Sequence, residues 1–170
     1  MEETVYYEDG GGTEKVDLKL EMRLCKPDVI HSKLWSETLV PIFVGFEKEN
    51  GGAFTTYDIA LAIGNGTSLL YVGHVDGEFA GLIVVELYGR GSSGSAPNVW
   101  ISYIVEKMRG STVVLQGAKY IEEQMVRLGA TTITAIGGNE STAKLFEKIG
   151  FERKYTQIHF VKKLGQANSV

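Results

Sequence analysis

Residues 99–129 read VWISYIVEKMRGSTVVLQGAKYIEEQMVRLG and join the two patterns that decide the fold. The first seven residues are almost all apolar, which predicts a strand in the middle of a sheet. After the connection 106–114, a long helix is expected to begin near Ser111. Its apolar residues recur at steps of four, three, four and three: Val114, Ala118, Ile121, Met125 and Leu128. Gly129 suits the end of this helix.

The chain then continues with a second strand and a second helix. TTITAIGG, residues 131–138, predicts a strand, and NESTAKLFEKIGFE, residues 139–152, predicts a helix. Asn139 can cap the start of this helix, and Gly150 can close its end with Phe151 folded back onto it. A strand, a helix and a strand in succession predict a parallel pair with a right-handed crossover. An alternating run over residues 153–164 predicts a last strand.

The first half of the chain adds antiparallel strands and two helices. An alternating run predicts a half-buried strand over residues 16–24, with Val16, Leu18, Leu20, Met22 and Leu24 on one face. A helix follows from Pro27, and Pro41 is expected to end or kink it. A second, short helix is predicted over residues 54–66. Two apolar runs within residues 68–89 meet at Asp76 and Gly77, the signal of a tight hairpin.

These elements predict an α/β (α+β) fold with a mixed sheet and helices on both faces. One domain is expected over residues 16–164, with a flexible segment at 1–15 and a loose tail at 165–170.

Composition excludes several classes of function. The formal net charge of −4 gives no reason to expect a nucleic-acid partner, and no apolar run approaches the roughly 20 residues that span a bilayer. The acidic first residues predict no signal or transit peptide. The single cysteine, Cys25, excludes an internal disulfide and fits a cytoplasmic protein. The three histidines have no metal-ligand spacing, so no metal site is predicted.

Element order and two motifs resemble the GNAT superfamily of N-acetyltransferases. In that family a strand, an Arg-Gly-x-Gly-x-Gly/Ala loop and a long helix precede a strand and an Asn-(x)-Ala-Leu-Tyr-x-Lys-x-Gly-Phe helix. The matching residues in this chain are Arg109, Gly110, Asn139, Ala143, Leu145, Lys148, Gly150 and Phe151. The resemblance covers residues 16–164 in element order and residues 98–151 in motifs. It implies a mostly antiparallel sheet with one parallel pair of strands that splay apart.

The resemblance also implies that acetyl-CoA binds as co-substrate at the start of the long helix. The unpaired N–H groups and positive end of a helix suit phosphate oxygens, and Arg109 adds charge. The strand end before this loop would bond the pantetheine arm as an added strand does. The residues implied in cofactor binding are Ile104, Val105, Glu106, Arg109, Gly110, Ser111, Thr112, Val113, Val114, Asn139, Ser141 and Phe146.

Three departures from the family pattern concern the loop and the chemistry. Thr112 and Val114 stand where the family has glycines, and Phe146 stands where it often has a proton-donating tyrosine. The strand over residues 131–136 carries no glutamate that could act as a base. Candidates to replace the missing groups are Tyr103, Tyr155 and Glu86. A wall or core position is the simpler reading for Tyr103, and a solvent-facing position for Glu86.

The sequence therefore predicts an N-acetyltransferase that moves an acetyl group from acetyl-CoA to a primary amine of a small molecule or protein, as a monomer or homodimer. The alternative is a catalytically silent GNAT fold that binds CoA or a protein partner. It is suggested by analogy with viral or mobile-element proteins of this architecture that lack some of the family's motif residues. A third reading, another α/β phosphate binder, is disfavoured because the chain lacks both a Lys-Ser/Thr phosphate loop and a dinucleotide glycine fingerprint.

Overall fold

A computed structural model of the chain describes residues 18–49, 51–87, 96–135 and 140–153. The chain divides into two compact units, Met1–Ile136 and Gly137–Val170. The first unit contains β1 (Leu20–Leu24), η1 (Pro27–His31), η2 (Leu34–Leu39), α1 (Val40–Glu49), α2 (Thr56–Gly64), β2 (Ser68–Val75), β3 (Glu78–Glu86), β4 (Asn98–Ile104), η3 (Glu106–Met108), α3 (Val113–Arg127) and β5 (Thr134–Ala135). The second contains α4 (Glu140–Lys148). The predicted extent of the domain, residues 16–164, stays a prediction.

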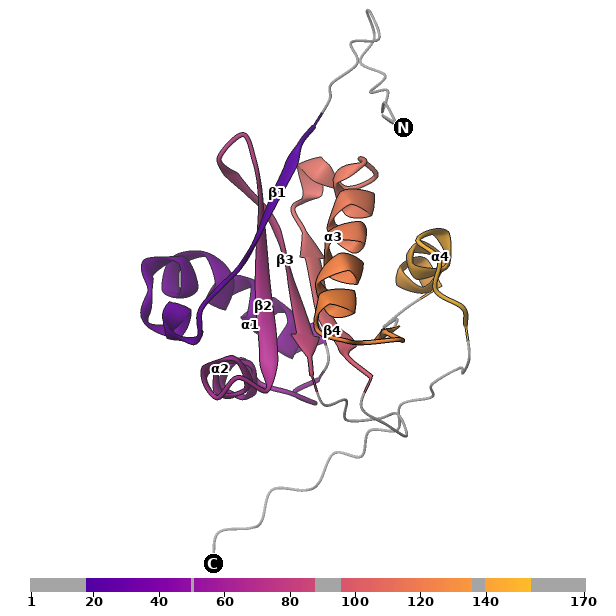
Figure 1. Ribbon diagram of the computed structural model, residues 1–170. Helices are drawn as coiled ribbons and strands as arrows, with labels where there is room; N and C mark the ends of the chain where they lie inside the picture. The colour runs from indigo at the N-terminus through magenta and orange to yellow at the C-terminus, as the bar shows by residue number, and fades with distance from the viewer. Residues whose placement is uncertain (1–17, 50, 88–95, 136–139, 154–170) are drawn as a thin grey trace, which may run out of the picture. The chain divides into compact units, whose positions relative to one another are not determined.

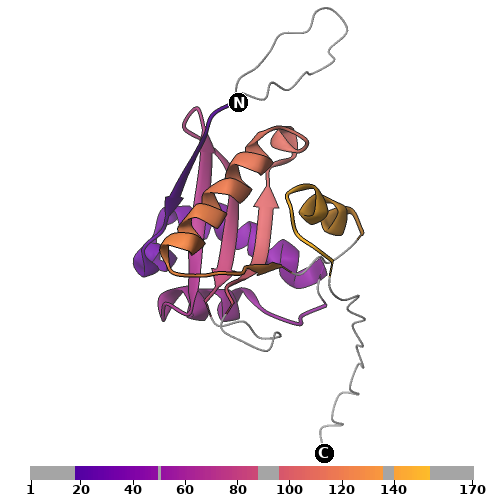
Figure 2. The same ribbon diagram turned by 45° about the vertical axis from the view of Figure 1, so that its right-hand side comes forward.

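The first unit is a sheet of five described strands in the order β1-β2-β3-β4-β5 (Figure 1). The first three pairings are antiparallel, whereas β4 and β5 are parallel. Helix α3 covers one face of the sheet, and α1 and α2 lie behind the other face (Figure 2). The predicted fold class, a mixed and mostly antiparallel sheet with one parallel pair and helices on both faces, is confirmed.

Alternation along the strands divides the core between the two faces. On β2, Leu70 and Val72 pack with the helices η2, α1 and α2, while Tyr71 packs with α3. On β3, Leu82 and Val84 join the first cluster and Val85 joins the second. These strands read as continuous apolar runs because both of their faces are covered.

The hairpin between β2 and β3 confirms the turn predicted from Asp76 and Gly77. These two residues have φ angles of 50° and 79°, the left-handed conformation that a two-residue hairpin turn requires. Four residues after the turn, Gly81 of β3 lies against the backbone of β4: a Cβ added there would be 2.3 Å from the carbonyl oxygen of Tyr103. Only glycine permits the two strands to come this close.

Helix α3 forms as predicted, but its buried stripe is shifted. The buried residues are Val113, Gly117, Ile121 and Met125, whereas Val114 and Ala118 are half-buried and Leu128 is 61 % exposed. The shift follows from a contact with β1: a Cβ on Gly117 would be 3.5 Å from the Leu20 side chain, so the helix approaches the sheet at this glycine. Gly129, with a φ of 84°, ends the helix as predicted.

Two other predictions about the N-terminal half need correction. Of the two outcomes expected at Pro41, an end or a kink, the first is wrong: the helix runs from the π-helical η2 directly into α1. In η2 the Val40 N–H already bonds the Trp35 carbonyl five residues back, and this wider turn accommodates the missing N–H of the proline. Leu24, expected on the buried face of the first strand, is 50 % exposed because it lies at the end of the edge strand β1.

In the second unit, α4 ends as predicted. Gly150 has a φ of 99°, and the Phe151 N–H donates to the Phe146 carbonyl at 3.0 Å. The rings of Phe146 and Phe151 lie 5.3 Å apart. Arg153 donates to the exposed carboxylates of Glu140 and Glu147. The capping role of Asn139, the second half of the predicted strand 131–138 and the strand 153–164 beyond residue 153 lie outside the described residues.

Candidate active site

The loop between β4 and α3 is the part of the predicted cofactor site that is best defined. The Val105 N–H donates to the Ala80 carbonyl of β3 at 2.9 Å, and η3 then turns the chain. Gly110 has a φ of 79°, a left-handed conformation that favours glycine. The buried Ser111 hydroxyl donates to the Met108 carbonyl at 2.6 Å and accepts from the Val113 N–H at 3.4 Å. The hydroxyl of Ser111 therefore holds the loop together.

Two backbone N–H groups and one positively charged side chain in this loop could bind a ligand. Among the described residues, the N–H groups of Gly110 and Thr112 have no hydrogen-bond acceptor. The Arg109 side chain is exposed, and its Nε lies 3.4 Å from the Ile104 carbonyl. The positive end of the 15-residue helix α3 follows directly. This set of groups suits an anion with several oxygens.

The side chains of Val113 and Val114, two of the three valines predicted in the site, differ in position. Val113 is buried in a cluster with Val75, Ala80 and Met108, so only its backbone lies at the loop. Val114 is half-buried, and its N–H already donates to the Ser111 carbonyl at 3.4 Å.

Strand β4 runs on past its described pairing with β5. The pairing with β5 joins Asn98 to Thr134 and Val99 to Ala135, and within the described residues it stops there while β4 runs on to Ile104. Ile104 is half-buried and Glu106 is exposed at the start of η3. The strand thus leads from a closed junction to the loop that holds Arg109.

A chain of three hydrogen-bonded polar residues, two of them buried, marks the junction. Asn98 donates through Nδ2 to the Glu86 carboxylate at 3.2 Å and accepts through Oδ1 from the Thr134 hydroxyl at 3.0 Å. Asn98 and Glu86 are 6 % and 8 % exposed. The chain links β3, β4 and β5 where the parallel pairing occurs. Sequence reasoning missed Asn98 and Thr134, because nothing local distinguishes them from ordinary polar residues at strand ends.

The expectation that Glu86 faces solvent is therefore wrong. The residue lies in the last position of β3, between Ser68 of β2 and Asn98 of β4, and only 8 % of it is exposed. Tyr103 lies near the opposite end of β4, where its half-buried ring meets Phe46 edge-on at 6.5 Å. The structure thus separates two of the catalytic candidates along β4.

The roles of the remaining predicted residues stay predictions. Tyr155 and Asn139 lie outside the described residues. Ser141 and Phe146 belong to the second unit, where Ser141 is exposed in α4 and Phe146 is half-buried.

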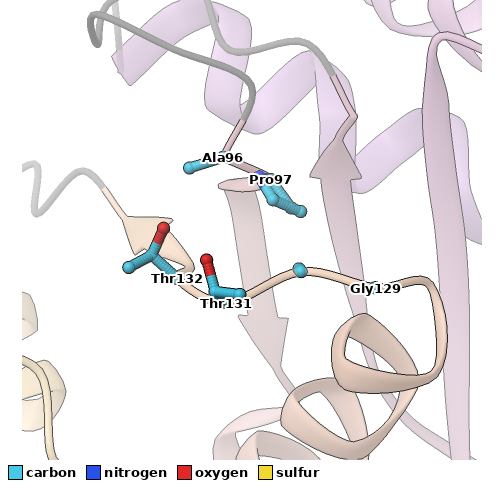
Figure 3. A pocket seen from close by; sticks show the side chains of 6 residues that line it. Ala96, Pro97, Gly129, Thr131 and Thr132 are labelled. Carbon is cyan, nitrogen blue, oxygen red and sulfur yellow. The ribbon is translucent and has the colours of Figure 1, made fainter.

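Two pockets in the described part of the first unit lie elsewhere. A small pocket of about 110 Å³ is lined by Ala96, Pro97 and residues 129–132, with Thr131 and Thr132 beside the start of β4 (Figure 3). A shallower one of about 390 Å³ is lined by Glu21, Met22, Arg23, His74 and Gly77. There, burial and the nearby Arg23 guanidinium lower the pKa of His74, and the Glu21 carboxylate partly opposes them. Neither pocket contains a predicted site residue.

The described residues contain neither a candidate metal site nor a membrane-spanning helix. In that part of the chain no group of three or more His, Cys, Asp or Glu side chains could hold a metal ion. Nor does any helix described there have the length and apolar character to cross a membrane.

Comparison of the whole structure with solved structures gives matches over most of the chain. The aminoglycoside antibiotic 6'-N-acetyltransferase AAC(6')-Ih from Acinetobacter baumannii matches with a TM-score of 0.61 and 11 % identity, over 86 % of this chain and 100 % of that one. The aminoglycoside N-acetyltransferase AAC(6')-Iy in complex with CoA matches with a TM-score of 0.62 and 15 % identity, over 86 % and 97 %. The chain has the GNAT fold.

The same fold extends to a protein-modifying enzyme among the matches. The ribosomal-protein-alanine N-acetyltransferase from Brucella melitensis biovar Abortus 2308 has a TM-score of 0.59 and 13 % identity, over 85 % of this chain and 100 % of that one. No protein-family profile matches the sequence, and comparison with curated proteins gives no match either. At these identities the GNAT fold is what the likeness shows.

Proposed function

We propose that this protein is an N-acetyltransferase that moves the acetyl group of acetyl-CoA to a primary amine of a small molecule or protein. One observation carries the proposal: β4 ends in a loop that holds an exposed arginine and two N–H groups without an acceptor among the described residues, directly before the 15-residue helix α3. The solved structures that share the fold include acetyltransferases of both acceptor classes and a complex with CoA. The cytoplasmic location stays a prediction.

The residues of the loop fit the diphosphate of the co-substrate. The N–H groups of Gly110 and Thr112 and the Arg109 guanidinium would hold it, because each supplies a donor or positive charge that the fold itself does not use up. The Ser111 hydroxyl is excluded from this role, because it already bonds the loop. The edge of β4 near Ile104, with Val105 and Glu106, would bond the amides of the pantetheine arm.

The chemistry needs an uncharged acceptor and a proton donor for the departing sulfur. Acetyl-CoA supplies the activated acyl group: a new C–N bond replaces the C–S bond, and the amine gives up a proton as the sulfur gains one. A lysine-like amine is neutral in roughly one molecule in 10³ at pH 7, a cost of about 4–5 kcal/mol that a base or water relay offsets. Tyr103, near the end of β4, is the candidate donor that the structure describes. Tyr155 stays a second candidate.

Thermal unfolding with and without acetyl-CoA tests the cofactor. At a hundredfold excess over Kd, the ligand should add about 2.7 kcal/mol, which raises the Tm of a domain of this size by roughly 5–10 °C. Arg109→Glu should abolish the rise. Arg127→Glu is the matched control, because it makes the same charge change at the other end of α3. This variant should still show the rise in Tm with acetyl-CoA. An unchanged Tm in the wild-type protein would overturn the proposal, and CoA release with a panel of amines tests transfer.

The second candidate function is a GNAT fold that binds CoA or a protein partner without catalysis. It is favoured by Phe146, whose ring packs on Phe151 to close α4 and which cannot donate a proton. The bulk of Val114, half-buried where the family has glycine, also favours it. A rise in Tm with acetyl-CoA, without transfer to any amine, would support this second function.

A further inference from the structure

Four partly exposed aromatic rings lie along the side of β4 that faces α1 and α2. They are Phe46 in α1, Phe54 in the loop before α2, and Trp100 and Tyr103 in β4, and together they are called the aromatic wall below. Phe46 meets Tyr103 edge-on at 6.5 Å, and Phe54 meets Trp100 edge-on at 5.3 Å. Each ring packs on the main core cluster with one side and keeps part of its surface in solvent.

A β-bulge brings Trp100 into the wall. Ile101 pairs with Val84 and Val99 pairs with Val85, so Trp100 is an extra residue of β4 inserted between two paired positions. In a regular strand Trp100 and Tyr103 would point to opposite faces. The bulge re-aims the indole, and both side chains pack against the same cluster.

The acidic groups next to the wall are already committed to local hydrogen bonds. The Glu47 carboxylate, beside Phe46, accepts from the N–H and the hydroxyl of Thr56 at 2.9 and 3.1 Å. The Asp58 carboxylate accepts from Thr55 in the capping box of α2. The described surface around the wall therefore offers ring faces more than carboxylates. Ring faces bind apolar groups and other rings, and they attract an ammonium group.

We propose that the aromatic wall binds the acceptor, and that the acceptor is a primary amine carried on an apolar or aromatic body. The inference rests on the proposed function, because Tyr103 directly precedes the strand edge assigned to the pantetheine arm. A ligand seated on the wall would have its amine near that edge. Polyamines and aminoglycosides carry several charges and no aromatic body, so they would gain less here, because the carboxylates of Glu47 and Asp58 already accept local hydrogen bonds.

Binding and transfer are measured with three probes on the full chain: phenethylamine, spermidine and kanamycin. Binding is followed by tryptophan fluorescence, since Trp35 is only 7 % exposed and Trp100, the other tryptophan, lies in the wall. Transfer is followed by CoA release. We expect phenethylamine to be preferred by about tenfold in kcat/KM. Trp100→Ala should weaken its binding by about tenfold and leave the rise in Tm with acetyl-CoA unchanged.

Tyr57→Ala is the matched control, because Tyr57 is an aromatic residue of α2 that is 73 % exposed and outside the wall. Phe54→Ala is a second wall variant if Trp100→Ala unfolds. Equal loss in Tyr57→Ala, or transfer to spermidine as fast as to phenethylamine, would overturn the inference and leave the proposed function standing. Saturable phenethylamine binding that is lost in Trp100→Ala, with no transfer, would support the wall and refute the acetyltransferase. If phenethylamine does not bind and no amine is acetylated, both the aromatic wall as acceptor site and the acetyltransferase activity are refuted.

Discussion

Replacing Gly81 by alanine tests the position of β4, on which both the cofactor edge and the aromatic wall depend. A Cβ at this position would lie 2.3 Å from the Tyr103 carbonyl oxygen and 3.2 Å from the Ile104 Cα. Both atoms are backbone, so they cannot turn away as the end of a side chain can. The strands can separate only at the expense of the adjacent hydrogen bond from the Val105 N–H to the Ala80 carbonyl, 2.9 Å long.

The expected cost of Gly81→Ala follows from this geometry. Overpacking in a close-packed interior costs about 1–3 kcal/mol, and the upper part of that range applies because the clash is with backbone. For a domain of this size each kcal/mol lowers the Tm by about 2–4 °C, so we expect a fall of roughly 5–10 °C. Thermal unfolding followed by circular dichroism measures it.

Two other glycines provide graded controls for the same assay. At Gly45, inside α1, an added Cβ meets nothing within 4 Å, so alanine should stabilise the helix by about 0.5–1 kcal/mol. At Gly73 the Cβ would meet the ends of the Met22 and Leu20 side chains at 2.8 and 2.9 Å, which can move, so the cost should be smaller than at Gly81. A Tm for Gly81→Ala within about 1 °C of the wild type would refute the close approach of β3 and β4.

Three further changes have expected outcomes. Thr134→Val removes the hydroxyl that bonds the junction amide at 3.0 Å and should cost about 0.5–1.5 kcal/mol in urea unfolding, while Thr134→Ser should restore most of it. Thr55→Ala removes the capping box of α2 and should cost about 1 kcal/mol in the same assay; no loss would contradict the cap. Arg23→Gln should raise the pKa of His74 in an NMR titration, because the guanidinium helps burial to lower it. The pKa of His74 in the folded chain lies below the unfolded value of 6.5, so the unfolded chain takes up this proton first as the pH falls. The stability linked to His74 is therefore lost as the pH falls through that value. Arg23→Gln should lose less of it, because its folded pKa is closer to the unfolded one.

Much of the secondary structure could be predicted because its signals act over a few residues. Asp76 and Gly77 set a hairpin turn, Gly129 ends α3, and Gly150 with Phe151 closes α4. Each outcome depends on φ preferences and on hydrogen bonds between near neighbours. The resemblance to the GNAT superfamily likewise came from element order and from motifs at fixed spacing.

Predictions failed where distant parts of the chain meet. Glu86 looked solvent-facing because a carboxylate on a strand usually is, yet it is buried beside Asn98, 12 residues away. The apolar spacing predicts a buried stripe on α3 that begins at Val114. The helix instead approaches the sheet at Gly117, where the Leu20 side chain lies beneath it. No local pattern contains this information.

The sequence by itself determined the order of the described strands and helices from β1 to α4, the hairpin turn, the glycines that end α3 and α4, and the arginine-glycine loop ahead of α3. Tertiary structure alone decided the bulge that turns Trp100 toward α1 and α2, the hydrogen-bonded chain from Glu86 to Thr134, and the bond from the Gln116 amide to the Leu18 carbonyl at 2.7 Å. The physical reason is range: helix and turn signals act between neighbours in sequence, whereas strand register and burial depend on contacts between residues tens of positions apart.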